Sequence, residues 1–143
     1  MGTFAGNVKD RQIILVSAVS QPRPTPSAPI PFDALLDTGA QATLITEKVV
    51  KDVGLVSIGT GRIIPVSGKV IETNKYRIRL DIPIGDEVVL PSGQRRVEPV
   101  LRGMELDVSQ LPYQPQNHDI LLGMDFINAC HLTVHGGRYI LSI

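Results

Sequence analysis

The stretch "FDALLDTGAQATLI", residues 32–45, decides the fold class because an apolar segment runs into Asp37-Thr38-Gly39 and a second apolar segment leads away. Asp and Gly are common turn residues, so the tripeptide alone indicates only a turn. Its context indicates more, because desolvation and neighbouring groups control the proton of a carboxylate at the end of a buried strand. Asp37 is therefore the first candidate for a reactive group.

A second motif, "DILLGMDFI", lies at residues 119–127 and places two bulky aliphatic residues directly before Gly123. Glycine has no Cβ, so it allows a buried strand to end beside another backbone at close range. We therefore expect Gly123 to mark a point where two chain segments touch.

The remaining apolar residues occur in short, β-branched segments bounded by Gly, Pro and Asn, which is typical of strands. In residues 76–84, four alternating aliphatic residues face one way, while Arg77, Arg79 and Asp81 face the other. Helices are expected only at residues 46–54, capped by Thr46 and ended by Gly54, and at residues 124–131. The expected strand segments are residues 12–19, 30–37, 61–73, 76–84, 87–92, 118–123 and 139–143.

The chain has 143 residues, of which 43% are hydrophobic, enough for one ordinary core, so residues 1–143 are predicted to form a single, mainly β domain. Residues 21–31 are predicted to form a proline-rich loop that connects two strands. Residues 90–118 mix Gly, Pro and charge, which predicts an irregular insertion with one strand near residues 97–106. The lone Cys130 excludes an internal disulfide and is interpreted as a small buried hydrophobe.

Fourteen basic and fourteen acidic residues give zero formal charge, so no long-range field attracts nucleic acid or an anionic membrane. No apolar run approaches the ~20 residues of a membrane span. We therefore expect a cytoplasmic protein with neither kind of partner. The glycines at 59 and 61 indicate a turn rather than a phosphate loop, and His131 and His135 lack further ligands, so no metal or other cofactor is expected.

Taken together, the two motifs resemble those of the retropepsin-like aspartic proteases. In that family a hydrophobic-hydrophobic-Asp-Thr/Ser-Gly-Ala element is paired with a later hydrophobic-hydrophobic-Gly element. The order of segments also fits, over residues 12–143. The resemblance implies a single-lobe acid protease fold with one or two short helices and an active site at a homodimer interface.

The resemblance also implies residue roles. Asp37 would be the catalytic carboxylate, Thr38 would bond across a two-fold axis to the partner's main chain, and Gly39 and Ala40 would let the substrate backbone pass closely. Residues 62–72 would form a flap, although their turn residues fit an ordinary hairpin equally well. The flap residues expected to contact substrate are Ile64, Val66, Ser67 and Gly68.

Aspartic proteolysis requires two carboxylates that share one proton, and the sequence holds a single Asp-Thr-Gly. Two chains must then each contribute one Asp37, which predicts a homodimeric endopeptidase that cleaves extended polypeptides with a carboxylate-activated water. One alternative is a non-catalytic dimerisation or peptide-binding module of the same fold, and another is an active monomer.

Two positions depart from the retroviral pattern. Many retroviral enzymes form an ion pair from an acidic residue and an arginine where this chain has Gln41 and Met124. Both partners are missing together, so no buried charge is left unpaired, and packing or hydrogen bonds must support the loop instead. The apolar C-terminal segment, residues 137–143, is expected to join an intersubunit sheet, the alternative being that it completes the sheet of its own subunit.

Overall fold

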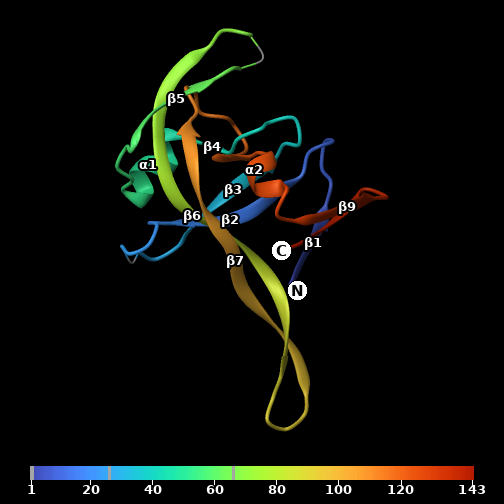
Figure 1. The fold of residues 1–143 in the computed structure, drawn as a ribbon. Coiled ribbons are helices and arrows are strands. Elements are labelled where there is room, and N and C mark those ends of the chain that lie inside the picture. Colours follow the sequence, from blue (N-terminus) through green and yellow to red (C-terminus); the bar gives the residue numbers. More distant parts are fainter. Residues whose placement is uncertain (1, 26, 66) are drawn as a thin grey trace.

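The computed structural model describes residues 2–25, 27–65 and 67–143 as a mainly β domain, which confirms the predicted fold class (Figure 1). Two short helices accompany the strands, as expected. The strands are β1 (Thr3–Asn7), β2 (Ile14–Ser20), β3 (Ile30–Leu36), β4 (Leu44–Ile45), β5 (Gly59–Ile63), β6 (Ile71–Val89), β7 (Arg95–Gln110), β8 (Ile120–Leu122), β9 (His131–His135) and β10 (Arg138–Ser142), and the helices are α1 (Glu47–Val53) and α2 (Met124–Ile127).

Six of the strands form a closed barrel around the core. They follow the order β2-β3-β8-β4-β7-β6, and pairing of β2 with β6 completes the circuit. The alternation expected in residues 76–84 is present on β6, but Asp81 on the opposite face is only 5% exposed and pairs with Arg79 at 2.9 Å. The largest fully buried side chains include Ile45, Ile78, Leu80, Ile82, Ile84, Ile120, Leu122 and Phe126.

A three-stranded sheet at the chain ends continues from the barrel. Strand β1 pairs with β6 at Thr3 and Gly85, and along its length with β10, which also pairs with β9. Both edges of β10 are therefore occupied within its own chain. The C-terminal strand completes its own subunit's sheet, contrary to the intersubunit pairing expected, and β9 forms the outer strand.

Strands β6 and β7 form one long antiparallel ribbon, paired from Lys75 and Ser109 to Val89 and Arg95. Its distal part projects from the barrel at the end opposite the β5–β6 hairpin (Figure 1). Residues 95–110 are thus one strand, longer than the strand predicted near residues 97–106 within an irregular insertion. Proline usually interrupts a strand because it has no N–H to donate. In a two-stranded ribbon the backbone nitrogen of Pro99 can face away from the other strand, so the pairing continues.

Helix α1 confirms the expected helix, and Gly54 ends it with a left-handed φ of 75°. Thr46 occupies the N-cap position, but its side chain makes no capping bond, and its buried Oγ1 has no hydrogen-bond partner. Helix α2 has only four residues. Among the described residues, no helix has the length and apolar character needed to cross a membrane.

Candidate active site

The loop that carries Asp37 crosses the end of a strand inserted from the other half of the chain. Strand β8 runs parallel to β3 and antiparallel to β4, so it lies between the two strands that flank the loop of residues 37–43. At the end of this arrangement the N–H of Asp37 donates to the carbonyl of Leu122 at 2.9 Å. The two motifs quoted from the sequence are therefore neighbours in space.

The Asp37 carboxylate is half-buried and is oriented by the loop's own backbone. The N–H of Gly39 donates to Asp37 Oδ1 at 2.9 Å, and the N–H of Ala40 donates to the Asp37 carbonyl at 3.2 Å. A Cβ on Gly39 would lie 3.2 Å from Oδ1, which is tighter than an ordinary van der Waals contact. Thr38 and Gly39 are exposed beside the carboxylate, and Ala40 is half-buried.

Gly123 makes the close backbone contact that its position predicts. A Cβ at this residue would lie 2.5 Å from the carbonyl carbon of Ala42 and 2.6 Å from its oxygen. Because backbone atoms cannot move aside as a flexible side chain can, only glycine fits here. This contact places the start of α2 directly behind the Asp37 loop.

A hydrogen-bonded brace between Thr43 and Asp125 supports the loop from behind, and sequence reasoning did not identify it. The Asp125 carboxylate accepts from the N–H of Thr43 at 2.9 Å and from its hydroxyl at 2.7 Å. The same hydroxyl accepts from the N–H of Gly123 at 3.1 Å. Further along, the N–H of Met124 donates to the carbonyl of Ala40 at 2.8 Å, and the N–H of Asp125 to that of Gln41 at 3.1 Å.

Gln41 and Met124 cannot form an ion pair, so the loop needs another support. The brace provides that support with hydrogen bonds. A signal for it exists in the sequence, because Thr43 and Asp125 are polar residues inside otherwise apolar motifs. Thr43 is fully buried, so its donors need acceptors within the protein.

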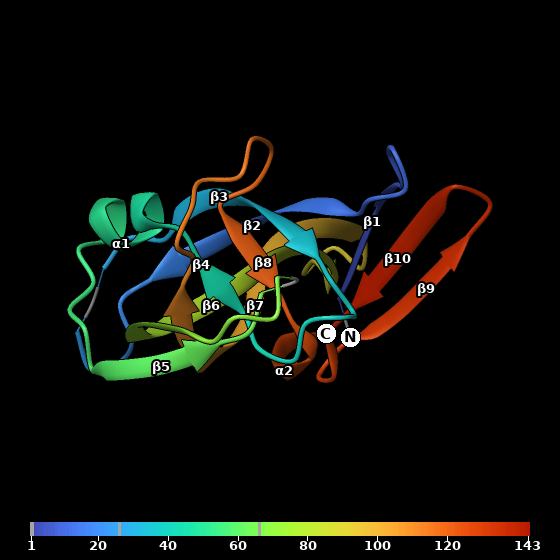
Figure 2. The same cartoon turned by 90° about the horizontal axis from the view of Figure 1, so that it is seen from above.

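The hairpin expected at residues 62–72 is present between β5 and β6, where Ile63 pairs with Ile71. In Figures 1 and 2 its tip reaches over the side of the barrel that carries the Asp37 loop and α2. Gly68 has a left-handed φ of 78°, and its N–H donates to the carbonyl of Pro65 at 2.9 Å. Ile64 is 72% exposed and Ser67 is exposed, whereas Val66 lies outside the described residues.

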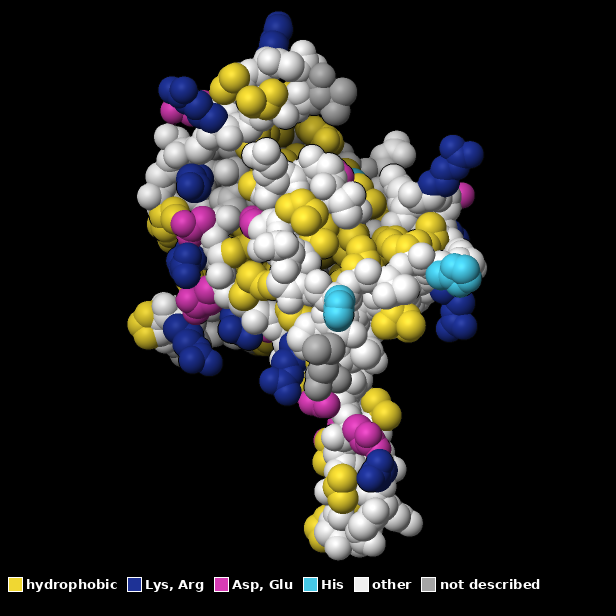
Figure 3. Space-filling view, turned by 45° about the vertical axis from the view of Figure 1, so that its right-hand side comes forward, with side chains coloured by type: hydrophobic (Ala, Val, Ile, Leu, Met, Phe, Trp, Pro, Cys, Tyr) yellow, Lys and Arg dark blue, Asp and Glu magenta, His cyan; other side chains and the backbone are white. Residues whose placement is uncertain are grey.

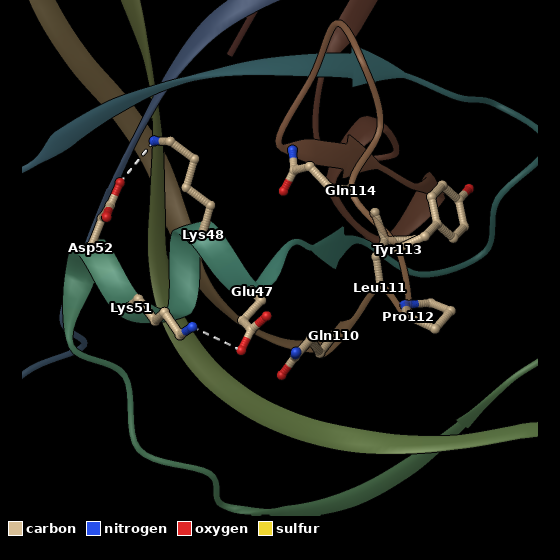
Figure 4. Close-up of a pocket in the computed structure, with 9 residues that line it drawn as sticks. All are labelled: Glu47, Lys48, Lys51, Asp52, Gln110, Leu111, Pro112, Tyr113 and Gln114. Atoms are coloured by element: carbon tan, nitrogen blue, oxygen red, sulfur yellow. Dashed lines mark hydrogen bonds and ion pairs between the residues drawn. The ribbon is translucent and has the colours of Figure 1, made fainter.

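The pocket of about 440 Å³ drawn in Figure 4 is separate from the Asp37 loop. It lies between α1 and residues 110–114 and includes neither Asp37 nor the β5–β6 hairpin. Its two lysines pair with acidic neighbours on the same helix, Lys48 with Asp52 at 2.8 Å and Lys51 with Glu47 at 3.1 Å. These pairs neutralise the helix side of the pocket, so the pocket offers no unpaired reactive group there.

Cys130 is also unsuited to chemistry. Burial raises the pKa of its thiol to about 11, so the thiol is protonated at neutral pH and is a poor nucleophile. The side chain packs against the core, in agreement with its interpretation as a small hydrophobe.

Comparison with known proteins gives a family match across the site. The family model described as "Aspartyl protease" matches residues 29–126, from the start of β3 into α2, which is 98 of the 143 residues. A search of curated proteins finds no match.

A search of solved structures finds similar chains. A retropepsin-like aspartic protease from Rickettsia conorii is 16% identical, with a TM-score of 0.52 over 98% of this chain and 90% of that one. A foamy viral protease-reverse transcriptase, solved with an RNA/DNA hybrid, is 20% identical with a TM-score of 0.42, over 85% of this chain and 13% of that one. The Rickettsia structure confirms the single-lobe architecture expected from the two motifs.

Proposed function

Because the chain belongs to the aspartyl protease family and has a retropepsin-like fold, we propose that it is an aspartic endopeptidase whose active site forms between two copies. The observation that carries this proposal is the placement of Asp37. Its carboxylate is half-buried at the end of a barrel strand, is held by the N–H of Gly39, and is the only Asp-Thr-Gly carboxylate in the sequence. A second Asp37 must come from a second copy.

The two carboxylates divide the reaction between them. One acts as a base and takes a proton from a water whose oxygen attacks the peptide carbonyl, while the protonated one donates a hydrogen bond to the carbonyl oxygen. The C–O bond forms, the C–N bond then breaks, and a proton passes to the leaving amine. The N–H of Gly39 keeps one Asp37 oxygen fixed, which leaves the carboxylate oriented before substrate arrives.

The neighbours of Asp37 have supporting roles in this proposal. The exposed hydroxyl of Thr38 bonds to the partner's main chain and holds the two loops in register. Gly39 has no side chain and Ala40 has only a methyl group, so an extended substrate backbone passes close to both residues. The β5–β6 hairpin closes over that substrate through Ile64, Val66, Ser67 and Gly68, and the exposed apolar side chain of Ile64 suits a contact with substrate.

Cleavage of a mixed peptide library between pH 4 and 7 tests this function. Purified protein should release new peptide ends, and the Asp37→Asn variant should release none while it keeps the far-UV and thermal unfolding signals of the parent. Asparagine is nearly isosteric and still accepts from Gly39, but it cannot act as the base. Equal cleavage by both proteins would contradict the assignment, and cleavage by neither would favour a binding module of the same fold.

A further inference from the structure

The projecting part of the β6–β7 ribbon, residues 83–102, forms an arm that the proposed chemistry does not use. The two strands pair with each other from Pro83 and Leu101 to Val89 and Arg95. Among the described residues, the only other strand contact on the arm is the pairing of Thr3 with Gly85 at its base. An isolated two-stranded ribbon is marginally stable in water, so further cover would stabilise the distal part of this arm.

One face of the arm is apolar and exposed. The pairing register places Val89, Val97 and Leu101 on the same face, where they are 64%, 71% and 42% exposed. Gly85 keeps this face flat, because a Cβ there would lie 2.7 Å from Val97 Cγ1. Figure 3 shows hydrophobic side chains along the arm beside charged ones.

The opposite face of the arm carries four charged residues beside Ile84, Val88 and Val100, and these charges are paired within the arm. Arg102 pairs with Asp86 at 3.2 Å, and Arg96 pairs with Glu98. With Glu87 and Arg95, residues 83–102 contain three acidic and three basic residues and carry no net charge. The arm therefore has no excess charge to select an anionic membrane, a nucleic acid or a highly charged protein.

The charges on the apolar face fit a second copy of this chain. That face carries one acid and one base, Glu87 and Arg95, 3.4 Å apart. A contact across a two-fold axis must be complementary to itself. If two arms pack face to face about an axis along the ribbon, β6 lies opposite the partner's β7. The pairing register then puts the partner's Val97 opposite Glu87 and the partner's Arg95 opposite Val89, so Glu87 and the partner's Arg95 are diagonal neighbours. The aliphatic stems of the charged residues cover the valines.

We propose that the apolar face of the arm is an intersubunit contact, which packs against the same face of a second copy. This inference rests on the proposed function, because that function requires two copies of the chain. It adds a contact remote from the Asp37 loop, and this contact brings the two carboxylates together at lower protein concentration.

A pair of charge-reversed chains tests the contact. Glu87→Arg places two guanidinium groups together at both contacts of a homodimer, and Arg95→Glu places two carboxylates together. In an equimolar mixture, the guanidinium at position 87 of one chain meets the carboxylate at position 95 of the other, and the second contact regains a native pair. Within each arm the like charges remain, so only an intersubunit contact is relieved by mixing.

Sedimentation velocity over a concentration series measures the result. Each variant alone should have a dimer Kd at least about tenfold above that of the parent, and the mixture should return to within about threefold. Variants that dimerise like the parent, or a mixture no more dimeric than its components, would overturn the contact. A parent that is monomeric at every concentration would overturn it as well.

Two neighbouring valines provide a matched control, since Val89 lies on the apolar face and Val88 on the charged one. Val89→Lys should weaken the dimer about tenfold and Val88→Lys should leave it nearly unchanged, and equal effects would reject the assigned face. Loss of binding to neutral phosphatidylcholine vesicles by Val89→Lys, with an unchanged dimer, would assign the face to a membrane. Sedimentation needs no catalysis, so a dimeric parent that cleaves nothing rejects the protease activity and leaves the arm contact standing.

Discussion

Removal of the Asp125 carboxylate should destabilise the Asp37 loop, because this residue is exposed but accepts from two buried donors of Thr43. Asp125→Ala deprives the buried N–H and hydroxyl of Thr43 of the acceptors that they reach at 2.9 and 2.7 Å. A buried donor left without a partner costs about 1–3 kcal/mol, so the two together should cost about 3 kcal/mol. For a chain of this length, such a loss lowers Tm by roughly 6–12 °C.

Urea unfolding measures this free energy. All variants are compared at one protein concentration, because the apparent stability of a dimer depends on that concentration. Asp107→Ala is the control, because Asp107 pairs with Arg77 at 3.0 Å while both side chains are more than 40% exposed, and such pairs contribute about 0–1 kcal/mol. Asp125→Asn should fall between the two, since its amide oxygen still accepts one of the bonds. The reasoning is refuted if Asp125→Ala loses no more stability than Asp107→Ala.

Three further predictions follow from the same site. Gly123→Ala should destabilise the fold by about 3 kcal/mol in urea unfolding, because its Cβ would lie 2.5 Å from the Ala42 carbonyl carbon, and a wild-type unfolding midpoint would contradict the contact. The pH dependence of kcat/KM should be bell-shaped with its maximum below pH 7, because two coupled carboxylates lose their protons in separate steps, and a flat profile would indicate another mechanism. Gly68→Pro should cut kcat strongly while Tm changes little, because proline cannot adopt a φ of 78° in the exposed hairpin tip, and unchanged kinetics would place the lid elsewhere.

The parts of the site that sequence predicts are those encoded by local chemistry. The Asp37 turn and the ending of α1 at Gly54 each depend on one residue type in one backbone conformation. The Gly123 contact is predicted because a glycine directly follows a buried strand, although its partner, Ala42, lies in a distant segment. The hairpin of residues 62–72 follows from turn residues between two apolar segments. The turns and the helix end can be predicted because residues close together in the sequence determine them.

The parts that sequence does not predict depend on which distant segments meet. Thr43 and Asp125 are 82 residues apart, and only the insertion of β8 between β3 and β4 brings them together. The pairing of β10 depends on β1, a five-residue strand with a glycine that carries little strand signal. Pro99 and Gly103 obscured the β6–β7 ribbon, although Gly103 is required in it because a Cβ would lie 1.8 Å from the carbonyl oxygen of Leu80.

The central claim, that two chains share one active site through their Asp37 residues, is tested most directly by mixing the parent with Asp37→Asn chains. If the site is shared, each parent chain captured by a variant chain is silenced, because the mixed dimer holds only one ionisable carboxylate. With nine variant chains to each parent chain after full exchange, activity per parent chain should fall about tenfold, as random pairing requires. Activity per parent chain that stays constant across the titration, with exchange shown by sedimentation or labelled subunits, would contradict the shared site.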